Sequence, residues 1–179
     1  LKSLGASNLS VLPLAAGKLV AINGKPLNAS DYGDDSRASN WIEGEVRVSW
    51  SAELPPSNRV ILGSWPAPDP DKAQVSVDES WFEMFQLALG DTMTLRFGDS
   101  EITAIVSSVR EVDWDSFRVN FFMMLDPKHG NALPHSLISS FHLPATEAGL
   151  SGLSRELPNL SLIDVKSILD RVRDIIDRV

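Results

Sequence analysis

Short runs in which apolar and polar residues alternate recur along most of the chain, and each predicts a β-strand. The expected strands lie at 19–22, 45–51, 59–62, 75–77, 92–97, 102–106, 117–125, 137–143 and 160–163. Asn23-Gly24 and Gly98-Asp99 are typical of two-residue turns, so the second pair predicts a hairpin between its flanking strands. The alternation is lost at Ser107-Ser108, which predicts a β-bulge there.

Apolar residues at helical spacing predict three helices. The first follows Asp78, whose carboxylate can accept from the free N–H groups of the first turn, and it runs to Gly90. A short helix begins at Pro144 and stops before Pro158. The third helix begins after Asp164 and runs to the end of the chain.

The C-terminal helix has one apolar stripe and contains neither Gly nor Pro. The stripe is formed by Val165, Ile168, Leu169, Val172, Ile175, Ile176 and Val179. Because the pattern is still in register at the last residue, we expect the helix to continue in a longer protein and to lead toward a membrane span. The alternative is a terminal helix that packs against the chain's own core.

Together these elements predict an α+β fold with mainly antiparallel β-sheet and a few packed helices. Residues 1–18 are predicted to be a poorly structured lead-in, and 19–179 to be the folded domain. The polar stretch 28–40 is predicted to be an exposed loop. A Pro-rich connection allows two lobes, with a boundary near 65–74.

The composition and net charge of the chain exclude several classes of binding partner and of functional site. The chain has 179 residues and a net charge of −8, which argues against binding nucleic acid or an anionic membrane surface. It has no Cys, which excludes disulfides, thiolate metal sites and Cys nucleophiles. No apolar run approaches the roughly 20 residues needed to cross a bilayer. The chain begins with Leu1 and not Met, so we expect residues to have been removed upstream.

The motifs of common active sites are missing from the sequence. His129, His135 and His142 do not have a metal-binding spacing, and the carboxylate clusters do not match a calcium loop. The segment 149–153 resembles a nucleophile elbow but lacks its last Gly. We therefore predict no catalytic residue, no metal and no cofactor. A hydrolase that brings together a distant Ser and His is an alternative.

The segment 111–122 combines large aromatic residues with an arginine and two acids. Aromatic residues and Arg supply most of the contact energy in protein interfaces. The candidate contact residues for a partner or substrate are Trp114, Phe117, Arg118, Phe121 and Phe122. An ordinary core with a connecting turn is the alternative interpretation.

The run Ser108–Arg118, followed by Asn120-Phe121-Phe122, resembles FtsX-like ABC transporter permeases with a MacB-type core domain. It is most similar to the subgroup with long periplasmic domains, the YbbP type. Shorter stretches agree in the same order, and they lie at 19–26, 58–65, 89–92, 140–144 and 160–165. The resemblance covers roughly residues 19–179. Val119 departs from it, because the family more often has Pro there.

The resemblance implies a non-catalytic periplasmic domain of a bacterial inner-membrane permease, placed just before a transmembrane helix. Such permeases work with a cytoplasmic ABC ATPase, bound through the membrane part of the full protein. They extract lipids or lipoproteins, or transmit force to a periplasmic partner. A periplasmic thioesterase/lysophospholipase-like enzyme is the companion implied for this subgroup.

In this interpretation the C-terminal helix couples membrane-helix motion to the packed sheet. The candidate coupling residues are Ile168, Leu169, Val172, Ile175, Ile176 and Val179. The runner-up hypothesis is a free periplasmic binding or adaptor module, which would carry a signal peptide and no membrane span. A Ser/His hydrolase is the third hypothesis, and it predicts turnover of ester substrates.

Overall fold

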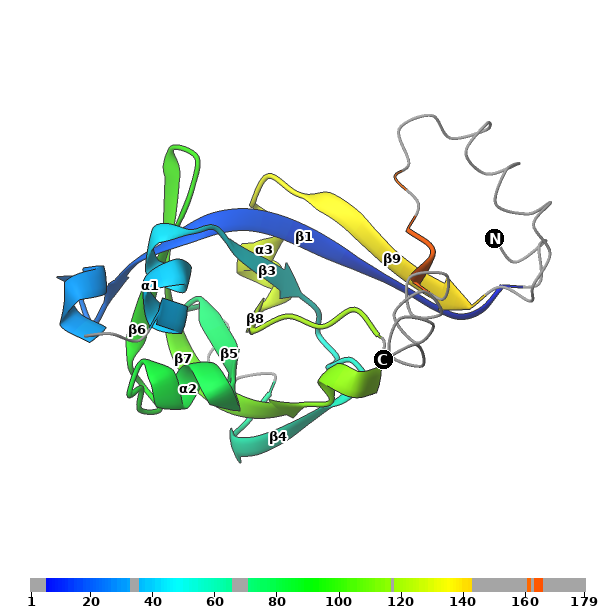
Figure 1. Cartoon of the computed structure of the whole chain (residues 1–179), viewed down its shortest axis with the longest axis horizontal. Coiled ribbons are helices and arrows are strands. Elements are labelled where there is room, and N and C mark those ends of the chain that lie inside the picture. Colours follow the sequence, from blue (N-terminus) through cyan, green and yellow to red (C-terminus); the bar gives the residue numbers. More distant parts are fainter. Residues whose placement is uncertain are drawn as a thin grey trace, which may run out of the picture. The chain divides into compact units, whose positions relative to one another are not determined.

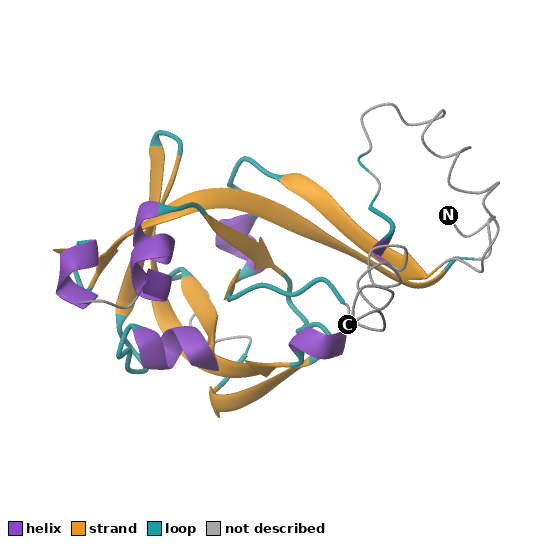
Figure 2. Cartoon of the chain, viewed as in Figure 1, coloured by secondary structure: helices purple, strands orange, loops and turns teal. Residues whose placement is uncertain are grey.

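The computed structural model describes residues 6–32, 36–65, 71–116, 118–142, 161 and 163–165. The chain divides into two compact units. One is Leu9–Ser140, which holds most of the described strands and helices, and the other combines Leu1–Asn8 with Phe141–Val179. Figure 2 shows that strands dominate the described part and that its helices are short.

Most of the described elements are labelled in Figure 1. In chain order, the described elements are β1 (Ser7–Ile22), β2 (Lys25–Pro26), η2 (Ala29–Tyr32), α1 (Ser36–Glu43), β3 (Val46–Trp50), β4 (Asn58–Gly63), β5 (Gln74–Asp78), α2 (Glu79–Met84), β6 (Thr92–Phe97), β7 (Ser100–Val112), η3 (Trp114–Ser116), β8 (Met123–Leu125), α3 (Pro127–Gly130) and β9 (Ser136–His142). No helix among the described residues is both long and apolar enough to cross a membrane.

Six of the strands pair in a closed ring. Going around it, β1 pairs with β3, β3 with β8, β8 with β5, β5 with β7, β7 with β6, and β6 with β1. The pairs β3–β8 and β5–β7 are parallel, and the other four are antiparallel. In addition, β2 and β9 pair with β1, and β4 pairs with β7. This mixed sheet with few helices is consistent with the predicted α+β class.

Alternate residues of the ring strands form the hydrophobic core. Eleven of them, each at most 1% exposed, are Leu19, Val46, Val48, Val75, Val77, Met93, Leu95, Ala104, Val106, Met123 and Leu125. Burial of this apolar surface is the main term that stabilises the ring. Because every core strand has neighbours on both sides, the ring is a rigid support for the loops that connect its strands.

Several local predictions are confirmed. The β6–β7 hairpin turns at Gly98, and the turn after β1 has Asn23 and Gly24 at φ values of 52° and 72°. Asp78 caps α2 by accepting from the Ser80 backbone N–H. The predicted bulge is present as well, since the β5–β7 register shifts and leaves Ser107 as an extra residue on β7.

Residues 7–18, predicted to be a poorly structured lead-in, instead form the first part of β1. Their backbone is paired, with Ala15 to Gly17 opposite β3 and a further pairing to β9. The stretch 28–40, predicted to be a loop, contains η2 and the start of α1. The helix was missed although Ala38, Trp41 and Ile42 have helical spacing, because they are the only apolar residues among its eight positions.

Two further predictions of secondary structure are wrong. Of the strand expected at 117–125, the described residues form only β8. The Phe121 and Phe122 carbonyls before it accept from the Arg110 side chain, and the Phe122 carbonyl also accepts from the Asp78 backbone N–H at the end of β5. The helix expected to run to Gly90 ends at Met84, and Gln86 has a φ of 51°, which is incompatible with a helix.

The two predicted lobes are not supported. The strands on either side of 65–74 are β4 and β5, and both pair with β7 in one sheet. The predicted short helix after Pro144 lies outside the described residues, and so does nearly all of the C-terminal coupling helix. Ser161 and Ile163, the described residues of the last expected strand, are not in a strand.

Candidate functional site

The segment 113–122 connects β7 to β8, and we name it the aromatic loop. Four of the five predicted contact residues are described, while Phe117 lies outside the described residues. Trp114 is 45% exposed and Arg118 is exposed, whereas Phe121 is buried and Phe122 is half-buried. Among the described residues of the loop, Trp114 and Arg118 are therefore open to solvent, and the rings of Phe121 and Phe122 are buried or half-buried.

The rings of the aromatic loop continue into the core through direct contacts. Trp114 packs on Phe122 with ring centroids 4.5 Å apart. Phe122 in turn lies 4.9 Å from Trp41 of α1 and 5.7 Å from Trp81 of α2. Trp81 then contacts Phe85 at 5.2 Å. Ring pairs at these separations are favourable beyond their buried area, so Trp114 is supported by both helices.

A buried arginine holds the C-terminal end of the aromatic loop. Arg110 of β7 is 0% exposed, and its Nη2 donates to the carbonyls of Phe121 and Phe122 at 3.0 and 3.3 Å. Its Nε donates to Ser76 Oγ at 3.0 Å, and its Nη1 donates to Asn58 Oδ1. Burial lowers the pKa of Arg110 to about 10, and the nearby Asp78 carboxylate partly opposes that shift. The guanidinium therefore stays charged at neutral pH.

Asn120 holds the middle of the same loop. Its Oδ1 accepts from Ser57 Oγ at 2.9 Å and from Asn58 Nδ2 at 2.8 Å. Its Nδ2 donates to the carbonyl of Asp113 at 3.2 Å. One amide thus joins the beginning of the loop to the segment that enters β4.

Sequence reasoning identified the aromatic residues but missed Arg110 and Asn120 as the groups that position them. The sequence contains a feature that could have drawn attention to each of these two residues. Arg110 interrupts the apolar end of a strand between Val109 and Val112, and Asn120 stands inside the run that carries the family resemblance. Their partners could not be identified, because those lie on other strands.

The histidines have structural roles where they are described. Asp126 caps α3, accepting from the backbone N–H of His129 at 3.0 Å and lying 2.8 Å from its Nδ1. Burial alone would raise the pKa of the Asp126 carboxyl, but hydrogen bonds from Gln74 and His129 outweigh it and lower the pKa. His135 packs edge-on against Trp50, and His142 ends β9 in an exposed position.

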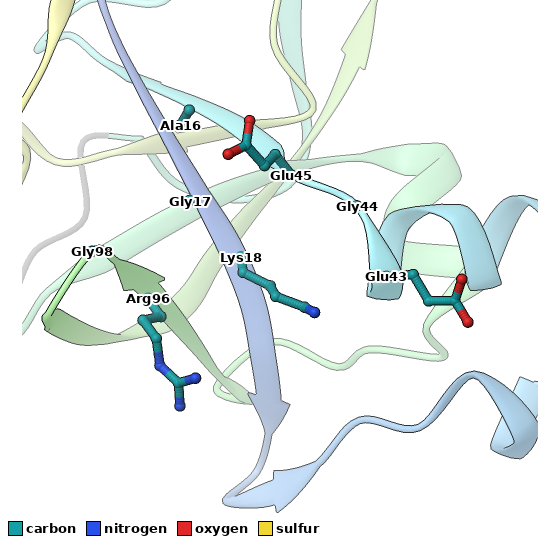
Figure 3. Close-up of a pocket in the computed structure, with 8 residues that line it drawn as sticks. All are labelled: Ala16, Gly17, Lys18, Glu43, Gly44, Glu45, Arg96 and Gly98. Atoms are coloured by element: carbon teal, nitrogen blue, oxygen red, sulfur yellow. The ribbon is translucent and has the colours of Figure 1, made fainter.

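The described residues contain no group of His, Asp or Glu arranged to hold a metal ion. A hollow of about 350 Å³ lies between β1, the end of α1 and the β6–β7 turn. Figure 3 shows that its charged side chains, from Lys18, Glu43, Glu45 and Arg96, point in different directions. Arg96 is also paired with Glu101 at 2.7 Å, so the hollow offers no converging charges to a ligand.

Comparison with known proteins gives one informative match. The chain is 33% identical over 163 residues to an uncharacterized ABC transporter permease, YbbP, of Escherichia coli (strain K12). The match covers 91% of this chain but only 19% of that protein, so the chain spans about a fifth of its relative's length. No protein-family model matches the chain.

Proposed function

We infer that the chain is a domain of an FtsX-like ABC transporter permease, because it is similar over 91% of its length to a segment of an ABC transporter permease. That similarity agrees with the resemblance carried by the run 108–122. We propose that the domain is periplasmic, that it carries no chemistry of its own, and that the full permease lies in the inner membrane with a cytoplasmic ATPase.

Within this role, we propose that the aromatic loop is the contact surface. Of the candidate contact residues, Trp114 and Arg118 are exposed and would make the contact, and Phe122 packs against Trp114. An exposed tryptophan and an exposed arginine in the same loop fit a ligand with an apolar body and an anionic group, as in a phospholipid or a lipoprotein. A thioesterase/lysophospholipase-like enzyme docked on the same surface is the alternative. The coupling helix of residues 168–179 would pass membrane-helix motion to the domain.

The periplasmic placement can be tested because the chain contains no Cys. Asp99→Cys puts a thiol at the exposed turn between β6 and β7. In the full-length permease in intact cells, we expect a membrane-impermeant maleimide to label this position. Ser49→Cys is the matched control, since Ser49 is 0% exposed and should be labelled only after denaturation. Labelling of position 99 only after the inner membrane is opened would contradict a periplasmic domain.

The contact role predicts a large effect of charge reversal at Arg118. Arg118→Glu in the full-length permease, assembled with its ATPase in phospholipid vesicles, should slow the extraction of a fluorescent phospholipid about tenfold. The melting temperature of the chain should not change, because Arg118 is exposed. Arg47→Glu, at another exposed arginine, on β3, serves as the control and should leave extraction as it was. Equal rates in the two variants would rule out the aromatic loop as the lipid contact.

A further inference from the structure

We propose that Arg110 is the positioning residue of this contact surface: from within the sheet it fixes the aromatic loop to β5 and β7, so that Trp114 and Arg118 are held rigidly by the strand ring. The inference rests on the proposed contact role of the loop, and its structural part can be tested independently.

The first support is the number of donors directed at the end of the loop. The Phe122 carbonyl accepts from Arg110 Nη2 at 3.3 Å and from the Asp78 backbone N–H at 2.8 Å. The Phe121 carbonyl accepts from the same Nη2 at 3.0 Å. These bonds take the place of strand pairing in this irregular segment and tie it to both β5 and β7.

The second support is that Arg110 and Asn120 share a partner. Asn58, at the start of β4, accepts from Arg110 through Oδ1 and donates to Asn120 through Nδ2. Beyond Arg110 the network continues to Ser76 Oγ, which also accepts from Ser108 Oγ at 2.7 Å. The loop is therefore continuous with β7 and β8 and hydrogen-bonded to β4 and β5. Such a connected network favours one loop conformation.

The third support is the choice of side chain. A buried cation is costly, and an apolar residue of similar size often stabilises a protein equally well or better. Only a guanidinium presents donors in a fixed planar fork, which here reaches a hydroxyl, an amide oxygen and three main-chain carbonyls at once. A lysine could satisfy only part of this set. We therefore assign Arg110 to fixing the loop conformation.

Hydrogen exchange of the 179-residue chain tests this assignment. Arg110→Met and Asn120→Ala are each expected to speed exchange of the amides in 113–122 about tenfold or more, because each removes the equivalent of one or more net hydrogen bonds. Exchange in β6 should stay unchanged, because β6 pairs with residues 100–105 of β7 and not with the end of β7 that carries Arg110. Arg59→Met is the control, since Arg59 is an exposed β4 arginine whose guanidinium pairs with Glu111 of β7 and not with the described residues of the loop.

Two readouts separate positioning from a general loss of stability. Arg110→Lys should restore part of the loop protection, and acrylamide should reach Trp114 more readily in Arg110→Met, as judged against the same variant carrying Trp114→Phe. Unchanged exchange in 113–122 in folded Arg110→Met would overturn the proposal. If that variant does not fold, Asn120→Ala, at a half-buried position, decides in its place.

The lipid extraction assay keeps this inference distinct from the proposed function. Faster loop exchange together with slower extraction in Arg110→Met supports both ideas. Faster loop exchange with normal extraction in both Arg110→Met and Arg118→Glu would leave Arg110 as the residue that fixes the loop, but would remove the loop from the transport surface, so the inference as stated would fail.

Discussion

Replacing Trp81 with alanine is expected to lower the free energy of unfolding by about 3–5 kcal/mol, the range found when a large aromatic is deleted from a packed core. Trp81 of α2 is 1% exposed. Its ring lies 5.1 Å from Trp41 and 5.7 Å from Phe122, so the deletion leaves a cavity under the aromatic loop. Urea denaturation followed by far-UV circular dichroism would measure the change.

Two matched variants show whether the effect arises from packing. Trp81→Phe should lower the free energy of unfolding much less. The indole Nε1 has no hydrogen-bond partner among the described residues, so its removal breaks no hydrogen bond. Trp114→Ala removes the same kind of side chain from the exposed end of the ring contacts and should cost less than about 1 kcal/mol. Comparable losses in Trp81→Ala and Trp114→Ala would mean that the exposed loop residue contributes as much stability as the core residue, which contradicts the prediction.

The elements predicted correctly are those that local chemistry determines. The Asp78 cap and the Gly98 turn each depend on residues a few positions apart, and the bulge at Ser107 follows from the alternation of one strand. The closed ring could not be predicted in this way. Its parallel pairs join strands distant in the sequence, such as β3 and β8, and alternation does not indicate the direction of the partner strand.

The candidate site, like the fold, was predicted only where it depends on local sequence. The composition of 111–122 identified the aromatic contact residues, and the structure divides them into exposed Trp114 and buried Phe121. The residue that fixes the loop was missed because its bonds are non-local. Arg110 is 52 positions from Asn58 and 34 from Ser76. A charged residue near a strand end is usually solvent-exposed, and only the fold shows that this one is buried.

The charge that faces this buried arginine gives the second large prediction. Asp78 is 3% exposed, and its carboxylate favours the charged form of Arg110. Asp78→Ala is expected to lower the free energy of unfolding by about 3–5 kcal/mol, because it removes the cap of α2 and the nearby carboxylate that favours the charged form of a buried cation. Asp78→Asn keeps an acceptor for the Ser80 N–H and should cost only about 2 kcal/mol.

A double-mutant cycle with Arg110→Met separates these two contributions. If the counter-charge matters, Asp78→Asn should cost markedly less in the Arg110→Met background than in the parent chain, because no buried cation is then left unpaired. The cap contribution, measured as the difference between Asp78→Ala and Asp78→Asn, should stay the same in both backgrounds. If the two substitutions are strictly additive, Arg110 is stabilised by its hydrogen-bond partners alone. The aromatic loop would then be held by hydrogen bonds that do not depend on the charge at the start of α2.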